Sequence, residues 1–375
     1  MRYTFIVLLI ATAAVAKTRA VRHPAPEPIA TYRGNAERNG VVRGTGPRTF
    51  TRIAWQTAVD ESFSAPVYAN GKVFVPTSDG RITTLSAATG EILWRSQRLG
   101  VFSSPPTIAG DVVYVSGEDK HIYALSAATG ATLWSFAEDD WGVGAPLWSN
   151  GTLYFGTEAG TLYAIDANTR AEKWRFSAGG HIHCHVVLSD GLVYFAAEKT
   201  IFALTASDGH EVWRKTRDAI WYAVPVSAGV LVATAEDGYV IAYDARSGAE
   251  RWHVAPPTGV RYWTPVALLN GVAYTTNDIR QVVAFDLLTG TTRWTYTASD
   301  MASEVVIADT VIYIGTFGAH QPNDDNEQKD VVALEAATGH ELFKTRLTGH
   351  NYTGVAAGEG MLFVMTSRGF VYALR

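Results

Sequence analysis

Short runs of alternating apolar and polar residues follow one another from about residue 50 to the end of the chain. Val, Ile, Tyr, Phe, Trp and Thr fill these runs, and turn-forming Gly, Asn and Asp separate them, which is typical of β-strands joined by tight turns. In one stretch the pattern predicts strands at 104–108, 111–116, 121–126 and 131–136. The hydrophobic positions do not follow a helical period. We therefore expect an all-β protein.

One phrase recurs at intervals of about forty residues: LSAATGEILW ends at Trp94, and LSAATGATLW ends at Trp134. Counted from Trp55, the aromatic residue that closes each copy recurs after 39, 40, 40, 39, 39, 42 and 49 residues, and seven of the eleven tryptophans lie in this register. Four antiparallel strands (A to D) in every forty residues form one blade of a β-propeller. Asn-Gly or Asp-Gly pairs mark the turn between the first two strands of several copies, which favours tight hairpins; they are Asn70-Gly71, Asn150-Gly151, Asp190-Gly191 and Asn270-Gly271.

Eight sets of inner strands can be counted, beginning near residues 64, 104, 145, 185, 224, 264, 304 and 354. The eighth set stops at the end of the chain, before its outer strand. The run FTRIAW at 50–55 supplies a strand with the missing tryptophan, and its pairing with Phe370–Leu374 would leave no open sheet edge. The sequence therefore predicts an eight-bladed β-propeller with tryptophan-docking motifs, closed by pairing the N-terminal strand with the C-terminal blade.

The consensus Ala-Leu-(Asp/Ser)-Ala-x-Thr-Gly-x-x-x-Trp resembles the tryptophan-docking motif of PQQ-like (quinoprotein-type) β-propeller repeats, over about residues 50–375. The run YRGNAERNGV at 32–41 is similar to the lead-in segment that precedes the first blade in that family. The resemblance implies the fold, whereas the family's functions range from dehydrogenases to assembly scaffolds and kinase sensor domains. In length, blade count and export the chain is similar to scaffolds of the BamB type, but it lacks the lipoprotein cysteine.

The N-terminus has the pattern of a secretory signal peptide over residues 1–16, with Arg2, an apolar stretch from Ile6 to Ala16, and small residues before Lys17. That stretch is too short to span a bilayer. Residues 17–49 read as a Pro-rich spacer and lead-in segment, and residues 50–375 as a single propeller. We expect an exported protein, periplasmic or extracellular, with no integral membrane segment after signal cleavage.

Charge and cysteine content restrict the function. Lys and Arg total 31 against 36 for Asp and Glu, with no long basic run, so we do not expect nucleic-acid binding. Cys184 is the only cysteine, and no intrachain disulfide can form. In the quinoprotein dehydrogenases that this family includes, the quinone lies against a disulfide ring of adjacent cysteines. If this chain were such an enzyme, the resemblance would imply the same ring here. One cysteine cannot make that ring, so we do not expect PQQ. We expect no cofactor, with a divalent metal as the alternative.

Because the four strands of a blade alternate in direction, the loops between the second and third strands emerge on the same face as the connections between blades, at the mouth of the central channel. Aromatic residues gather in those connections and predict a ligand or partner site there. Alternatively, the same rings cover the blade ends and exclude water. The candidate binding residues are Phe63, Phe102, Trp141, Trp221, Tyr222, Tyr262, Trp263 and Tyr352.

Three histidines at positions 181, 183 and 185 share one face of a predicted inner strand, so His181, His183 and His185 are candidate ligands of a divalent metal. The alternative is that they line a wet channel without metal. The expanded loop at 317–330, with four acidic residues, should project over the same mouth as a solvated loop; it lacks the spacing of a calcium site.

These observations favour a non-catalytic binding or scaffold module of the cell envelope, with an envelope protein or a glycan as its partner at the mouth. A carbohydrate-binding protein or a metal-dependent enzyme at the mouth is the alternative, with the histidines and Arg261, Tyr262 or Glu304 moving protons. No catalytic residue is assigned, because the sequence contains no recognisable serine triad, phosphate-binding loop or paired-carboxylate motif.

The signal peptide predicts cleavage after Ala16. When the full-length gene is expressed in a Gram-negative host, we expect the mature chain to start at Lys17 and to be recovered outside the cytoplasm. N-terminal sequencing and the intact mass of the purified protein test this. An intact Met1 in the cytoplasmic fraction would contradict it.

Overall fold

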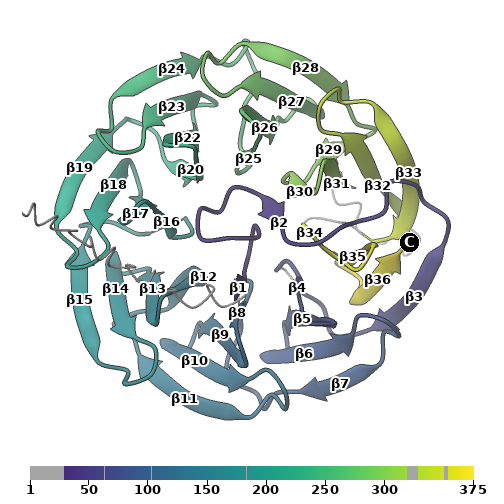
Figure 1. The fold of residues 1–375 in the computed structure, drawn as a ribbon, viewed down its shortest axis with the longest axis horizontal. Coiled ribbons are helices and arrows are strands. Elements are labelled where there is room, and N and C mark those ends of the chain that lie inside the picture. The colour runs from purple at the N-terminus through teal and green to yellow at the C-terminus, as the bar shows by residue number, and fades with distance from the viewer. Residues whose placement is uncertain (1–28, 63, 103, 183, 319–327, 350–353) are drawn as a thin grey trace, which may run out of the picture.

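The computed structural model describes residues 29–62, 64–102, 104–182, 184–318, 328–349 and 354–375. Within these residues the chain forms strands and turns and no helix. The strands make eight sheets that surround a central axis as the blades of a propeller, and within each blade neighbouring strands are antiparallel (Figure 1). The predicted fold class is confirmed.

The first four blades follow one another along the chain. Blade 1 comprises β4 (Val67–Ala69), β5 (Lys72–Thr77), β6 (Arg81–Ser86) and β7 (Ile92–Arg95). Blade 2 comprises β8 (Thr107–Ala109), β9 (Val112–Gly117), β10 (His121–Ser126) and β11 (Thr132–Ala137). Blade 3 comprises β12 (Gly142–Ser149), β13 (Thr152–Thr157), β14 (Thr161–Asp166) and β15 (Glu172–Ser177). Blade 4 comprises β16 (Val187–Ser189), β17 (Leu192–Ala197), β18 (Thr200–Thr205) and β19 (Glu211–Thr216).

The other four blades complete the ring. Blade 5 comprises β20 (Trp221–Ala223), β21 (Val226–Ser227), β22 (Val230–Ala235), β23 (Val240–Asp244) and β24 (Glu250–Val254). Blade 6 comprises β25 (Ala267–Leu269), β26 (Val272–Thr276), β27 (Gln281–Asp286) and β28 (Thr292–Thr297). Blade 7 comprises β29 (Met301–Ala302), β30 (Val306–Ala308), β31 (Val311–Phe317), β32 (Gln328–Glu335) and β33 (Glu341–Thr348). Blade 8 comprises β34 (Val355–Gly358), β35 (Met361–Thr366), β36 (Phe370–Leu374) and the N-terminal β3 (Ile53–Ala58).

The ring closes between the two ends of the propeller sequence. β3 pairs antiparallel with β36, so that Ile53 lies opposite Leu374 and Ala58 opposite Phe370. The backbone N–H of Arg52 also donates to the carbonyl of Arg375 at 3.0 Å. The predicted closure is confirmed, and it gives the last blade the outer strand that its own sequence lacks.

The repeated Thr-Gly-x-x-x-Trp phrase joins neighbouring blades. The Trp94 ring packs on Gly130 of the next blade, where a side-chain carbon on that glycine would lie 2.4 Å from the ring. Gly130 also has a positive φ of 73°, so only glycine satisfies both the turn and the contact. The indole N–H of Trp94 donates to the carbonyl of Ala127. Equivalent glycines lie against five other docking tryptophans: Trp55, Trp174, Trp213, Trp252 and Trp294.

The lead-in segment enters the centre of the ring (Figure 1). Its first strand, β1 (Ile29–Ala30), pairs with β8 of blade 2, and its second, β2 (Val41–Val42), pairs with β30 of blade 7. Between these strands, carbonyls of the lead-in accept hydrogen bonds from the inner strands of blades 4, 5, 6 and 7. The segment therefore lines the inner ends of the blades instead of lying outside the propeller.

Arg38 fixes the lead-in in the channel. Its side chain is 2% exposed. Its Nε donates to the carbonyl of Val186, Nη1 donates to Thr31 and to the carbonyl of Tyr32, and Nη2 donates to the carbonyls of Ala145 and Pro146. Burial lowers the pKa of this guanidinium, yet all five of its N–H groups are used, all on oxygen atoms. The lead-in is thereby bonded to blades 3 and 4.

Glu138 is a buried carboxyl group without a hydrogen-bond partner. It lies between β11 and β12, is 8% exposed, and neither of its oxygens is bonded within the described chain. Burial, with the nearby carboxylates of Asp139 and Asp119, raises its pKa to about 9. The neutral acid is therefore the form that the folded protein holds at neutral pH.

Replacing Arg38 by Met should lower the thermal stability, because the carbonyls of Tyr32, Ala145 and Val186 would lose the donor that Arg38 gives them, while that of Pro146 would keep only the Thr107 hydroxyl. We expect a loss of about 3 kcal/mol, the usual result of breaking a buried charged network. Calorimetry measures the melting temperature, and hydrogen exchange should show faster exchange over residues 29–42. Arg48→Met is the control. Arg48 belongs to the same lead-in segment but is exposed, and it pairs with Glu335 of blade 7. An Arg38→Met protein that melts with the wild type would contradict the assignment.

Glu138→Gln should stabilise the protein increasingly as the pH rises. The folded-state pKa lies above the unfolded value of 4.5, so the folded state holds the proton more tightly. The free energy of unfolding of the wild type is thus highest below about pH 4.5. It falls as the pH rises toward 9, by at most about 1.4 kcal/mol per pH unit. We expect the two proteins to melt alike near pH 5 and to diverge by pH 8. A difference independent of pH would contradict this, and Glu236→Gln, on an exposed loop, serves as the control.

Candidate functional site

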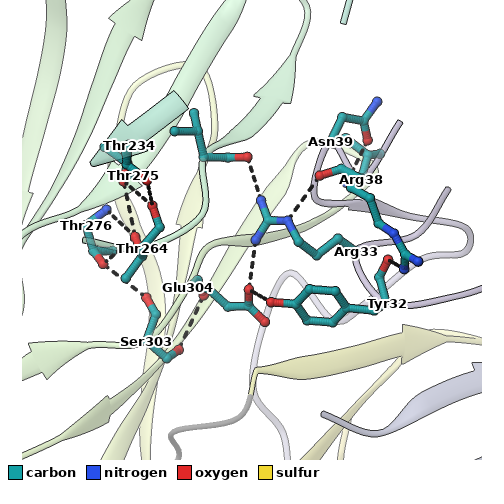
Figure 2. A network of polar contacts seen from close by, with 12 residues as sticks. Tyr32, Arg33, Arg38, Asn39, Thr234, Thr264, Thr275, Thr276, Ser303 and Glu304 are labelled. Atoms are coloured by element: carbon teal, nitrogen blue, oxygen red, sulfur yellow. Dashed lines mark hydrogen bonds and ion pairs between the residues drawn. The ribbon is translucent and has the colours of Figure 1, made fainter. Parts of the chain in front are cut away.

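The centre of the channel holds an ion pair between the lead-in and blade 7 (Figure 2). Arg33 Nη1 lies 2.9 Å from Glu304 Oε2, with the two side chains 2% and 9% exposed. The same oxygen accepts the O–H of Tyr32. Arg33 also donates to the carbonyls of Val266 and Arg38, at 2.6 and 3.1 Å. Burial and the Glu304 carboxylate raise the pKa of Tyr32, so the phenol stays protonated and donates.

A chain of hydroxyl groups continues from this centre into the inner ends of blades 5, 6 and 7 (Figure 2). Thr234 donates to the carbonyl of Thr264, whose hydroxyl bonds to Thr275 and Thr276. Thr276 reaches the carbonyl of Ala302 at 3.2 Å. These contacts join three blades beside the ion pair, so this part of the channel wall is held rigidly by side chains.

The mouth of the channel is built by one repeated contact. At the start of blades 1 to 6, a residue of the connection that precedes the blade accepts, on its carbonyl, the N–H of a residue at the start of the loop between strands B and C. We call the twelve residues of these six contacts the mouth rim. The acceptors are Glu61, Val101, Trp141, His181, Ile220 and Arg261, and the donors are Ser78, Glu118, Glu158, Glu198, Glu236 and Asp278.

The mouth rim is acidic. Five of its six donors, in consecutive blades 2 to 6, are Glu or Asp. Asp278 pairs with Arg261, and Glu158 lies 3.0 Å from His181, whereas Glu118 and Glu236 have no ion-pair partner among the described residues. When the copies of the repeat are aligned, the sequence shows an acidic residue at this position in five of them. We had not predicted these acids as site residues.

Large apolar side chains are exposed on the same face. Val101 and Trp141 of the mouth rim are 46% and 44% exposed, and Ile279, next to Asp278, is 44% exposed. Of the eleven tryptophans, all of which the structure describes, Trp141 alone is exposed. The mouth therefore combines unpaired carboxylates with accessible apolar surface.

The predicted aromatic residues fall into different environments. Phe102, Trp221 and Tyr262 are buried, and the Trp221 indole donates to the carbonyl of Lys199. Their rings pack in the hydrophobic clusters between blades, as the alternative interpretation expected. Tyr222 and Trp263 are partly buried, with the Trp263 ring 5.6 Å from Phe317. Phe63 and Tyr352 lie outside the described residues. The assignment of the set to a binding site stays a prediction.

The two described histidines of the predicted metal cluster also differ. His181 is exposed on the mouth rim, with its Nδ1 near Glu158 and its Nε2 4.0 Å from Glu198. His185 lies under the lead-in, its ring 4.1 Å from Tyr32, and its Nδ1 accepts the N–H of Ala145. Burial and the neighbouring guanidinium groups lower the pKa of His185. Within the described ranges no three His, Cys, Asp or Glu side chains could hold a metal. His183 lies outside them, so the metal site stays a prediction.

The residues of the channel do not fit a quinone cofactor of the kind that the family's dehydrogenases use. Cys184 is buried, and its sulfur accepts the N–H of Ala196 at 2.8 Å. Burial raises its pKa to about 12, and the sequence has no second cysteine with which it could form a disulfide. The chain therefore cannot form the ring of adjacent cysteines against which those enzymes hold PQQ.

Nothing in the described segments forms a helix of the length and apolarity that crossing a membrane requires. The predicted signal peptide, residues 1–16, and most of the Pro-rich spacer lie outside the described residues.

Solved structures confirm the fold and place it among proteins of several functions. BamB from Moraxella catarrhalis superposes with a TM-score of 0.71 at 16% identity, over 86% of this chain and 99% of that one. Quinohemoprotein alcohol dehydrogenase from Comamonas testosteroni superposes with a TM-score of 0.72 at 15% identity, over 96% of this chain and 81% of that one. The computationally designed Ika8 protein gives 0.72 at 14% identity, over 84% and 97%. At such identities the likeness concerns the fold alone.

Sequence comparison is more specific. Among curated proteins, serine/threonine-protein kinase AfsK of Streptomyces coelicolor is 31% identical over 69 residues, which are 18% of this chain and 9% of the kinase. The chain thus spans a small part of that relative's length. The family model described as outer membrane protein assembly factor BamB matches residues 38–140, 132–220, 220–324 and 280–375. Because these matches cover the whole propeller, the chain belongs to the family of outer membrane protein assembly factor BamB.

Proposed function

We propose that this protein is an exported, non-catalytic binding or scaffold module of the cell envelope, and that it holds a protein partner on the mouth rim. Membership of the BamB family supports the scaffold role. The sequence of residues 1–16 supports export, and with it a periplasmic or extracellular location.

The exposure of Trp141 is the observation that carries the proposal. The other ten tryptophans are buried or partly buried, whereas Trp141 is exposed, as is Val101 of the mouth rim. Exposed tryptophans are frequent centres of binding energy in protein interfaces. Two further acids of the mouth rim, Glu118 in blade 2 and Glu236 in blade 5, lack ion-pair partners in the described chain. The rim therefore complements a partner that carries Lys or Arg beside an apolar contact.

The lead-in restricts where a partner can bind. It fills the inner ends of blades 4 to 7 and carries the buried side chains of Arg33 and Arg38 into the channel. A segment that crossed the whole channel would have to break the Arg33–Glu304 ion pair. A contact on the outer surface of the mouth needs no such rearrangement, and rigid surfaces of this kind suit a scaffold.

A photo-crosslinking amino acid at position 141 tests the proposal in the native host. We expect discrete adducts with one envelope protein, and about tenfold weaker binding of that purified protein to Trp141→Ala, as for the loss of an interface tryptophan. The matched control is position 288. Leu288 is 68% exposed, but its turn joins the last two strands of blade 6 and therefore lies on the opposite face. Adducts at 288 alone, or at neither position, would contradict a partner at the mouth rim.

A further inference from the structure

At two points of the ring a tyrosine on the second strand of a blade bonds that blade to the next one. Tyr154, the third residue of β13 in blade 3, donates its hydroxyl proton to the carbonyl of Ala206 at 3.2 Å. Tyr274, the third residue of β26 in blade 6, donates to the carbonyl of Ala336 at 3.1 Å. Tyr194 is the third residue of β17 and holds the same position in blade 4. The repeat therefore predicts the same hydrogen bond between blades 4 and 5.

The Tyr194 hydroxyl does not make this bond. The corresponding carbonyl of blade 5, that of Ala245, accepts the indole N–H of Trp213 at 2.9 Å. No described residue is hydrogen-bonded to the Tyr194 hydroxyl, although Tyr194 is only 1% exposed. Burial, with the carboxylates of Asp190 and Asp244, raises the pKa of this phenol, so it keeps its proton at neutral pH. Because a buried phenol ordinarily has a hydrogen-bond partner, this donor is left for a molecule outside the chain.

Blade 4 also lacks an ion pair that its neighbours have. In blades 3, 5 and 6 the Lys or Arg directly before the docking tryptophan pairs with the Asp that lies eight residues before that tryptophan. The pairs are Lys173–Asp166 at 3.9 Å, Arg251–Asp244 at 2.7 Å and Arg293–Asp286 at 2.6 Å. In blade 4 the two positions are Val212 and Thr205, and Val212 is 45% exposed. The surface that carries an ion pair in the other blades is therefore neutral and accessible here.

A groove of about 500 Å³ lies at this place, between blades 4 and 5. Tyr194 lines it, together with both residues that replace the ion pair, Thr205 and Val212. Leu192 and Ala245 add apolar walls. The volume falls within the range of about 300–1,000 Å³ that is usual for small-molecule pockets.

Two charged side chains border the groove on neighbouring blades. Asp190 lies in the turn between β16 and β17 of blade 4, and Arg246 in the turn between β23 and β24 of blade 5. Both are exposed, and neither forms an ion pair in the part of the chain that the structure describes. Both lie near the phenol, because, besides burial, the Asp190 carboxylate raises the pKa of Tyr194 and the Arg246 guanidinium lowers it. A ligand with one negative and one positive group would pair with both side chains.

We propose that this groove binds a free α-amino acid with an aliphatic side chain. Its carboxylate accepts hydrogen bonds from Tyr194 and Arg246, and its ammonium group donates to Asp190. Its side chain packs on Leu192 and Val212. The groove opens at the end of β23 that faces away from the mouth rim, so this site is separate from the rim and does not depend on the proposed scaffold role.

L-Leucine is the probe, with two analogues that each lack one charge: leucinamide has no carboxylate, and 4-methylpentanoate has no ammonium group. Calorimetric titration of the purified protein should give at least tenfold weaker binding for both analogues. In TROSY spectra of the isotope-labelled chain, leucine should shift the amide signals of Asp190 and Arg246. Those of Asn150 and Gly151, in the equivalent turn of blade 3, should stay in place. No shift at Asp190 and Arg246 up to about 10 mM leucine, a very weak affinity, would overturn the proposal, as would equal binding of the three compounds.

Variants of the groove test its two unusual features. Tyr194→Phe should bind leucine about tenfold more weakly, whereas Tyr154→Phe, which removes a hydroxyl already bonded to Ala206, should bind like the wild type. The double variant Thr205→Asp/Val212→Arg gives blade 4 the ion pair of blades 5 and 6, and it should abolish binding while the melting curve reports folding. Unchanged binding to a folded double variant would overturn the site, and unchanged binding to Tyr194→Phe would overturn the role of the phenol.

Arg246 lies on an exposed turn, so Arg246→Ala tests the carboxylate contact without disturbing the interior. It should weaken leucine binding about tenfold and leave leucinamide binding unchanged. Arg48→Ala, an exposed arginine outside the groove, is the control and should bind like the wild type. An Arg246→Ala protein that keeps the wild-type preference for leucine over leucinamide would overturn the assignment of Arg246.

Discussion

The buried guanidinium of Arg38 is the interaction on which the centre of this propeller depends. A charge can be held in the interior only where its hydrogen-bonding groups are satisfied, and here every N–H of the side chain meets an oxygen atom. Those oxygens belong to the lead-in and to blades 3 and 4. A lysine has one donor atom where arginine has a fork of three nitrogens, so it could not reach the same set. The lead-in is therefore fixed in the channel by a contact specific to arginine.

The path of the lead-in then decides which parts of the inner surface are available. From Ala36 to Gly40 it follows the inner strands of blades 4 to 7 closely, and the Arg33–Glu304 pair holds it across the channel. Beyond Gly40 the lead-in stays beside blades 7 and 8, where β2 pairs with β30 and the carbonyl of Thr45 accepts the N–H of Gly360. The mouth rim is built independently, by contacts within the repeats themselves.

The structural relatives include both scaffold proteins and quinoprotein dehydrogenases. What they share with this chain is the fold, and in this chain the docking of a tryptophan on the glycine of the next blade, as for Trp94 and Gly130, joins the blades. That contact holds neighbouring blades together in the ring, and it does not constrain the loops at the two ends of the channel. Function in such a fold depends on side chains outside the repeat. The function proposed for this chain rests on the exposed Trp141 and the unpaired acids of the mouth rim, and the single Cys184 is buried among apolar residues.

Short-range patterns that repeat are enough to predict the eight blades, their turns and the closure of the ring. These patterns are the alternation along each strand, the residues with positive φ in the inner turns, and one aromatic residue per blade. The sequence by itself did not determine which members of a pattern reach the surface. Trp141 and Trp221 both follow outer strands, yet one is exposed and the other buried, because burial depends on neighbours far away in the chain. Tertiary structure alone placed Arg33 and Arg38 inside the channel, since their partners lie more than a hundred residues away.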